Sequence, residues 1–83
     1  MPRFYFDVST GDDITRDDEG LDLASLEDVE REAKRGATDM SRDCLPDGCS
    51  EISVQVRDEH GERVLTVTVS MTVRREAFVL AYA

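Results

Sequence analysis

The sequence lacks several features by which common functional classes are recognised. Its 83 residues include no tryptophan, two prolines, two cysteines and one histidine. A structural zinc site takes four ligands, and His60 lies far along the chain from both cysteines. The longest apolar run covers only residues 77–83, well short of the ~20 residues of a membrane-spanning helix. We therefore expect no membrane partner, and zinc binding is disfavoured.

Basic residues are also scarce. Ten Lys and Arg stand against nineteen Asp and Glu, which gives a formal net charge of −9 at pH 7. The excess of acid is concentrated in residues 1–50, and no basic patch with interleaved aromatic residues occurs in the chain. Because a negative field repels phosphate groups at long range, we expect no nucleic-acid partner.

A secretory signal is not recognisable in residues 1–7, which lack the basic-then-apolar layout and the cleavage site. We therefore expect a cytoplasmic protein with reduced thiols. The length predicts one small domain over residues 1–83, with an apolar tail from about residue 74. Such a domain buries only about 60% of the surface that its unfolded chain exposes. A deep substrate cavity is not expected, and an interface between two copies would bury more surface.

Alternating apolar residues predict two strands in the first part of the chain. Residues 3–8 predict a strand, residues 9–13 are turn formers, and residues 20–23 predict a short second strand. The side chains expected to face the core are Phe4, Phe6, Val8, Leu21 and Leu23.

A helix is predicted from the N-cap Ser25 to about Leu45. Asp28, three residues after Ser25, can close a capping box, and the turn sequence from Pro46 to Gly48 ends the helix. Residues at 3,4 spacing form one apolar stripe, which comprises Leu26, Val29, Ala33, Ala37, Met40 and Cys44.

The exposed face of this helix carries two predicted charge pairs, Glu27–Arg31 and Glu30–Lys34, each at i,i+4 spacing. Gly36 lies inside the helix, where glycine costs roughly 1 kcal/mol relative to alanine. We expect this glycine to permit a close approach of the helix to the sheet.

The second half of the chain predicts a β-hairpin. Apolar and polar residues alternate over residues 52–56 and 65–73, so one face is buried and the other is solvated. An even-membered loop at residues 58–61 keeps both apolar sets on one face. The expected cross-strand pairs are Val54 with Leu65 and Ile52 with Val67.

These elements predict an α+β domain of the order ββαββ. The simplest assembly is a four-stranded antiparallel sheet with one helix packed on one face. A strand order of second, first, third and fourth makes every neighbouring pair antiparallel with a right-handed crossover.

An acidic loop between residues 12 and 22 is a candidate site for Ca²⁺ or Mg²⁺, because carboxylate oxygens are the ligands that these ions prefer. The EF-hand spacing fails: a loop starting at Asp13 places Asp18 where glycine is needed, and one starting at Asp17 places Leu21 at the fifth position. A solvated turn with helix-capping acids is the favoured interpretation over a divalent-metal site or a small metal-dependent enzyme. The acids concerned are Asp12, Asp13, Asp17, Asp18, Glu19 and Asp22.

Two further candidates are the cysteines and the histidine. Cys44 and Cys49 flank a tight turn, so their Cα atoms could lie about 4.4–6.8 Å apart, the separation that a disulfide requires. Packing as inert thiols is the favoured interpretation, with Cys44 as a small buried hydrophobe. A redox-responsive pair is the alternative. For His60, in the hairpin loop, an exposed turn residue is favoured over a proton carrier.

Two surfaces suggest interaction rather than catalysis. The solvated face of the sheet is expected to be a broad, uncharged hydroxyl surface, and the chain from Ala77 to Ala83 is entirely apolar. This face is interpreted equally well as a surface for pairing with another sheet or edge, or as an ordinary threonine-rich face, since threonine favours strands. An apolar tail must cover its own domain or enter another chain, and a partner chain is favoured. The residues of the predicted hydroxyl face are Ser53, Gln55, Thr66, Thr68, Ser70, Thr72 and Tyr5.

Several short motifs follow one another along the chain in a fixed order. They are Met1-Pro2-Arg3-Phe4-Tyr5-Phe6, the turn at Gly11, Asp17 to Leu23, Glu32-Ala33, and Val56-Arg57-Asp58-Glu59 with Gly61 before a Thr/Val-rich strand. In this order they resemble a family of short uncharacterised proteins of alphaproteobacteria such as rhizobia, and the resemblance extends from Met1 to about Val73. That family is classed as a domain of unknown function, so the resemblance implies a small bacterial cytoplasmic protein and assigns no site residue.

The leading hypothesis is a non-enzymatic interaction module that self-associates, as a homodimer, through the open sheet face, the last strand or the tail. A small protein partner is a variant of this hypothesis. The alternatives are a redox- or stress-responsive regulator that uses Cys44 and Cys49, and a divalent-metal binder or metal-dependent small enzyme that uses the acidic loop. We expect no catalytic, cofactor-binding or metal-ligating residue.

Overall fold

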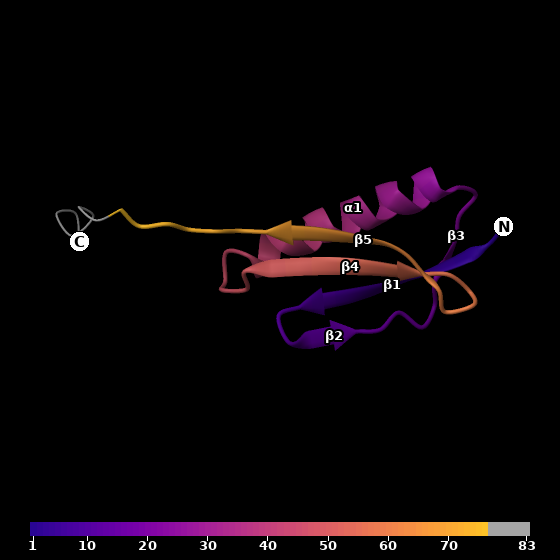
Figure 1. The fold of residues 1–83 in the computed structure, drawn as a ribbon, viewed down its shortest axis with the longest axis horizontal. Helices are drawn as coiled ribbons and strands as arrows, with labels where there is room; N and C mark the ends of the chain where they lie inside the picture. Colours follow the sequence, from indigo (N-terminus) through magenta and orange to yellow (C-terminus); the bar gives the residue numbers. More distant parts are fainter. Residues whose placement is uncertain (77–83) are drawn as a thin grey trace.

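The computed structural model describes residues 1–76, which form one helix and five strands (Figure 1). The predicted tail from residue 74 therefore falls mostly on residues 77–83, outside the described part of the chain. The elements are β1 (Arg3–Thr10), β2 (Asp13–Thr15), β3 (Leu21–Asp22), α1 (Leu26–Cys44), β4 (Glu51–Arg57) and β5 (Arg63–Ser70).

The sheet is antiparallel throughout, with the order β2-β1-β4-β5, and β3 also pairs with β1. The helix packs on one face of it (Figure 1). The predicted α+β class and the position of the short strand beside β1 are confirmed. The four-strand count is one short, because Asp13 of β2 was predicted as part of a turn and Ile14 and Thr15 were assigned to no element.

Strand β2 exists because β1 is longer than predicted. β1 continues to Thr10, and Gly11, with φ +60°, turns the chain back so that Thr10 pairs with Asp13. Ile14 is the only apolar residue of β2 and is 74% exposed. An isolated apolar residue has no periodicity, so the sequence carries no signal for this strand.

The helix begins and ends as predicted. The Ser25 hydroxyl accepts a hydrogen bond from the Asp28 N–H at 3.2 Å, and the helix ends at Cys44. Of the two predicted charge pairs, Lys34–Glu30 is present at 3.1 Å, whereas Arg31 pairs with Asp28 at 3.0 Å in place of Glu27.

The hairpin keeps the predicted faces but not the predicted register. Val54 pairs with Val67 and Ile52 pairs with Val69, a shift of two residues from the prediction. The loop spans residues 58–62, and an irregularity near Val56 compensates for its odd length. Because side chains alternate with a period of two, a shift of two leaves the apolar set on the same face.

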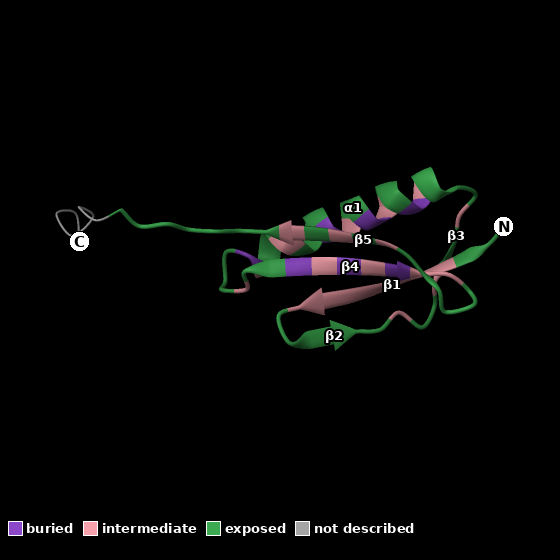
Figure 2. Ribbon diagram, in the orientation of Figure 1, coloured by how far each residue is buried: buried purple, intermediate pink, exposed green. Residues whose placement is uncertain are grey.

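The core lies between α1 and β4, where Figure 2 shows the buried residues on the strand and on the facing side of the helix. The helix packs over β4 and β5 and barely touches β1. A helix with its side chains is about 10 Å wide and strands are about 4.8 Å apart, so one helix covers about two strands. The fully buried side chains are Val29, Ala33, Ala37, Ile52, Val54 and Val56.

This offset of the helix leaves the inner face of β1 partly open. Phe6 and Val8 are only half-buried, although both pack against the core as predicted. Leu23 also packs against the core. Leu21 was predicted to point inward, but it is 44% exposed, because α1 does not extend over this side of the sheet.

Candidate functional site

A polar network surrounds the carboxylate of Asp17, in the loop between β2 and β3. Oδ2 accepts a hydrogen bond from the backbone N–H of Phe6 at 3.0 Å. Oδ1 accepts hydrogen bonds from the N–H groups of Glu19 at 3.0 Å and Gly20 at 3.2 Å. One side chain thus holds its own loop in a tight turn and ties that loop to β1.

Asp17 fills a gap in the pairing of β1. β3 pairs with β1 up to Phe4, and β2 pairs with β1 from Val8 onward. Between these positions that edge of β1 has no strand partner in residues 1–76, and the N–H of Phe6 donates to Asp17 instead. A carboxylate here performs the hydrogen bonding that a strand performs elsewhere along the edge.

Asp7 and Arg57 hold the same loop from the face of the sheet opposite α1. Asp7 Oδ1 accepts a hydrogen bond from the N–H of Asp17 at 2.9 Å, and Arg57 Nε donates to Asp7 Oδ2 at 2.9 Å. Arg57 Nη2 donates to the carbonyl of Asp17 at 2.8 Å, and the guanidinium lies 4.6 Å from the centre of the Tyr5 ring. We call the residues Tyr5, Asp7, Asp17 and Arg57 the Asp17 clip.

The electrostatics of the Asp17 clip favour fixed charges. Partial burial works to raise the pKa of Asp7, but the hydrogen bond from Arg57 and the N–H of Asp17 outweigh it, so this pKa is lowered. Partial burial also works to raise the pKa of Asp17. Hydrogen bonds from three backbone N–H groups outweigh this effect, so the pKa of Asp17 is lowered. The hydrogen bond to Asp7 raises the pKa of Arg57. A catalytic acid or base needs a pKa near the working pH, so these groups serve structure better than proton transfer.

Sequence reasoning did not identify the Asp17 clip. Asp17 was assigned to a solvated acidic loop, and Asp7 and Arg57 were not singled out. Arg57 pairs across the strands with Tyr5, which places it diagonal to Asp7, and opposite charges at diagonal positions attract. This signal becomes visible only after the pairing of β1 with β4 is known.

The other acids of the loop do not converge. Asp12, Asp13 and Asp18 are exposed, and Asp22 forms an ion pair with Arg3 at 3.1 Å. Within residues 1–76, no three His, Cys, Asp or Glu side chains lie close enough together to hold a metal ion. The donors predicted for a divalent cation therefore point to separate places.

His60 lies in an exposed turn. Asp58 Oδ1 accepts hydrogen bonds from the N–H groups of His60 and Glu62, each at 2.9 Å, and Gly61 adopts φ +83°. The side chain that organises this turn is therefore Asp58, and His60 takes part through its backbone.

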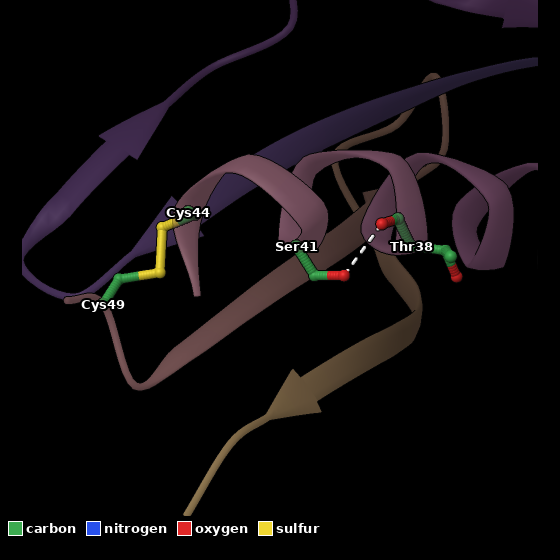
Figure 3. Close-up of a disulfide and its surroundings, with 4 residues drawn as sticks. All are labelled: Thr38, Ser41, Cys44 and Cys49. Atoms are coloured by element: carbon green, nitrogen blue, oxygen red, sulfur yellow. Dashed lines mark hydrogen bonds between the residues drawn. A yellow bond between two sulfur atoms is a disulfide. The ribbon is translucent and has the colours of Figure 1, made fainter. Parts of the chain in front are cut away.

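The two cysteines are joined in a disulfide that links the end of α1 to the segment before β4 (Figure 3). Their Cα atoms are 5.6 Å apart. The favoured interpretation of inert, separate thiols is wrong, and the geometry required by the redox alternative is present. Near the same helix end, the Ser41 hydroxyl donates to the carbonyl of Thr38 at 2.8 Å (Figure 3).

An apolar groove runs beside α1 on the side of β1. We call it the α1–β1 groove and define it by Phe6, Val8, Leu21, Gly36 and Met40, which line a volume of about 230 Å³. A Cβ atom added at Gly36 would meet no atom within 4 Å, so the prediction that this glycine permits close packing on the sheet is wrong. Gly36 leaves space in the groove, at a cost of about 1 kcal/mol of helix stability.

Strand β5 forms an open edge of the sheet. It pairs only with β4 among the described strands. The Met71 N–H donates to the carbonyl of Ser50 at 2.9 Å, and hydrogen-bonded pairs alternate along an antiparallel ladder. Thr66, Thr68 and Ser70 therefore direct their backbone N–H and C=O groups away from β4, toward the outer edge.

The open edge lacks the usual protection against pairing. From Val64 to Val73 the chain contains no charged residue and no proline. Natural edge strands are commonly protected by charges, prolines or bulges. The one irregularity in the β4–β5 ladder lies at its hairpin end, near Val56 and Arg57, and the pairing from Leu65 to Ser70 is regular.

The predicted hydroxyl face is present only over β4 and β5. There Ser53 and Thr68 share a hydrogen bond between their hydroxyl groups at 2.9 Å. Toward β1 the same face carries the Asp7–Arg57 ion pair, and Tyr5 lies against Arg57. The expectation of a broad uncharged face is therefore too wide, and the uncharged surface adjoins the β5 edge.

Comparison with known proteins gives one match. A family model described as a domain of unknown function, DUF6894, matches residues 3–70, which span the sheet and the helix. No curated protein and no solved structure matches the chain. No helix within residues 1–76 has the length and apolarity needed to cross a bilayer.

Proposed function

The chain therefore belongs to the DUF6894 family of domains of unknown function, and from its geometry we propose a non-enzymatic interaction module that self-associates through the β5 edge. The observation that carries the proposal is the edge strand β5, of which every residue after Arg63 is uncharged, within a ten-residue stretch from Val64 to Val73 that contains no charge and no proline. Two copies related by a twofold axis would pair their β5 strands antiparallel and join their sheets. A twofold interface closes on itself, so it produces a dimer rather than a fibre.

Two features of the domain support this proposal. The hydroxyl surface over β4 and β5 adjoins the open edge, and the charged residues of these two strands, Glu51, Arg57 and Arg63, lie at the strand ends. A second sheet would therefore meet uncharged side chains along the middle of the edge. The polar network with the most hydrogen bonds, the Asp17 clip, has its charges fixed by structural bonds, which supports a role other than acid–base catalysis.

Replacing Thr68 with proline tests the edge directly. The N–H of Thr68 points away from β4, so proline removes an outward donor and leaves the β4–β5 ladder its hydrogen bonds. We expect the dissociation constant of the dimer to rise by about tenfold or more, because the substitution removes one backbone hydrogen bond from each of the two copies. Sedimentation equilibrium on the full chain, with a protomer mass of 9.3 kDa, measures this constant.

The matched control is Thr68→Ala. It removes the hydroxyl bond to Ser53, as proline does, but keeps the outward N–H. We expect the alanine variant to dimerise like the wild type, and circular dichroism checks that both variants are folded. A second edge variant, Thr66→Lys, adds a like charge to the edge strand of both copies and should also weaken the dimer. Equal dissociation constants for all four chains, or a wild type that stays monomeric at millimolar concentration, would refute β5 pairing.

A second candidate function rests on the disulfide. In a cytoplasm, which is the location we propose, thiol buffers keep most protein disulfides reduced. Cys44 and Cys49 would then bond only on oxidation, by exchange with a disulfide such as oxidised glutathione, which takes up two electrons and two protons as two thiols. The bond lies near the end of β5 on its β4 side, because Ser50, which follows Cys49, accepts the N–H of Met71 just after β5. Such a pair would act as a redox- or stress-responsive regulator of the edge.

Trapping the thiols in cells with an alkylating reagent tests this candidate. We expect two alkylated cysteines in unstressed cells and none after treatment with an oxidant. In the purified chain, reduction should lower the free energy of unfolding by about 2 kcal/mol, the stabilisation expected from closing so short a loop. Thiols that remain free after oxidation would exclude the redox role. A disulfide that is complete in unstressed cells would argue against the cytoplasmic location.

A further inference from the structure

The α1–β1 groove is an apolar surface that residues 1–76 leave uncovered. Met40 and Leu21 are 42% and 44% exposed, and Phe6 and Val8 beneath them are only half-buried. A Cβ atom added at position 36 would meet no atom within 4 Å, and the chain has glycine there, at a cost in helix stability. Gly36 thus leaves space in the groove that a larger residue would begin to fill.

We propose that the α1–β1 groove binds the apolar segment of residues 77–83 from a second copy of this chain. The proposal builds on self-association, but it uses a surface other than the β5 edge, so either contact can fail alone. Seven consecutive residues of the segment are apolar, and they include Phe78, Leu80 and Tyr82. The groove, at about 230 Å³, is below the roughly 300–1,000 Å³ of a small-molecule pocket, which suits a short row of side chains.

The charges beside the groove complement the chain that precedes the segment. Four acids line the groove or its mouth, and Arg16 is the one basic residue among the lining side chains in the described part of the protein. The acids are Asp17, Asp18, Glu19 and Glu32. The segment follows directly on Arg74, Arg75 and Glu76. Two arginines placed near four carboxylates orient the approaching segment, because complementary charges steer encounter and fix register.

The course of the chain after β5 favours a groove on another copy. Residues 71–76 are all exposed, and Figure 1 shows them running away from the sheet and the helix. The groove lies over β1, two strands away from β5 and on the far side of β4. Reciprocal exchange of the segment between two copies would fill both grooves in one closed assembly.

Photo-crosslinking on the full chain tests this contact. Phe78 is replaced by benzoylphenylalanine, a photoreactive phenylalanine analogue, and this unlabelled chain is mixed with an isotopically heavy chain that lacks it. We expect the photoproduct to join the light segment to a heavy peptide that contains Met40 or Phe6, as mass spectrometry reads directly. Adducts within single chains, or adducts elsewhere on the heavy chain, would overturn the proposal.

A groove-filling variant and its control sharpen the result. Gly36→Leu in the heavy chain should lower the yield of the adduct at Met40 and Phe6 by about tenfold, the effect of losing one well-buried apolar contact. Lys34→Leu adds the same side chain to an exposed position of α1 and should leave the yield unchanged. An equal yield in the Gly36→Leu chain would remove the groove as the site.

The same crosslink separates this inference from β5 pairing. In Thr68→Pro chains at a concentration that still gives dimers, the adduct should map to the same groove residues. A raised dissociation constant of the Thr68→Pro dimer, with the mapped site unchanged, supports both contacts. A dimer that depends on Thr68 but gives no groove adduct supports the β5 edge and overturns the docking of residues 77–83.

Discussion

Replacing Asp17 with alanine should lower the free energy of unfolding by about 2–3 kcal/mol, although the residue lies in a surface loop. Three backbone N–H donors, those of Phe6, Glu19 and Gly20, lose their acceptor. An unsatisfied, partly buried donor costs about 1–3 kcal/mol, and water replaces part of the loss in an open loop. In a domain whose total stability is on the order of 5 kcal/mol, this change is large. Urea unfolding followed by circular dichroism at neutral pH measures it.

Asp18 provides the control, and pH provides a second readout. Asp18 is the exposed neighbour of Asp17, and Asp18→Ala should change stability by less than about 0.5 kcal/mol. Since the pKa of Asp17 is lowered in the folded state, its contribution is complete above the unfolded pKa of about 3.9 and is lost as the pH falls through the folded pKa. The difference between wild type and Asp17→Ala should therefore shrink on acidification. A difference that is already absent at neutral pH would show that the Asp17 clip does not stabilise the fold.

The features that the sequence predicted correctly are those encoded over a few residues. The Ser25 cap and Asp28 lie three residues apart, and the alternation in β4 and β5 gives the buried face of each strand directly. The hairpin register was wrong by two residues, because an alternating pattern is unchanged by an even shift. The turn determines the register. In it Asp58 accepts hydrogen bonds from two backbone N–H groups, and the irregularity near Val56 accommodates the odd number of loop residues.

The Asp17 clip depends on distances that no local pattern contains. Asp17 contacts Phe6 eleven residues earlier, and Arg57 contacts Asp7 fifty residues earlier. In the sequence Asp17 is one of several neighbouring acids, and only the unpaired edge of β1 distinguishes it from Asp18. The disulfide was only partly predictable. The short spacing of Cys44 and Cys49 permits the bond, but the spacing alone does not favour it over two separate thiols.

The two proposed interaction surfaces have one physical origin. A single helix covers about two strands, and here it covers β4 and β5. The inner face of β1 is therefore left as a groove, and the far side of β5 is left as an edge. A larger domain would add a second helix over β1 and another strand beside β5. A second copy of the chain can supply both, which is the reason that we propose self-association.

Replacing Gly20 with alanine should lower the free energy of unfolding by about 3 kcal/mol, and the loss has two separable parts. Gly20 has φ +75°, a conformation that costs an alanine about 1–2 kcal/mol. Its new Cβ would also approach the carbonyl oxygen of Phe4 to 2.9 Å, and this backbone atom is held in the β1–β3 pair. Relieving that contact requires the loop to move away from β1, which costs about 1–3 kcal/mol more by the usual penalty for overpacking.

Gly11 isolates the first part of this loss. It has φ +60°, but a Cβ atom there would meet nothing within 4 Å. Gly11→Ala should therefore lower the free energy of unfolding only by the cost of the backbone conformation, about 1–2 kcal/mol. Chemical unfolding of both variants gives the steric part as their difference. If the free energy of unfolding falls by the same amount in the two alanine variants, the close approach of the loop to β1 adds no steric cost. A larger loss for Gly20→Ala would show that the acidic loop stabilises the fold by packing tightly on the strand that it borders.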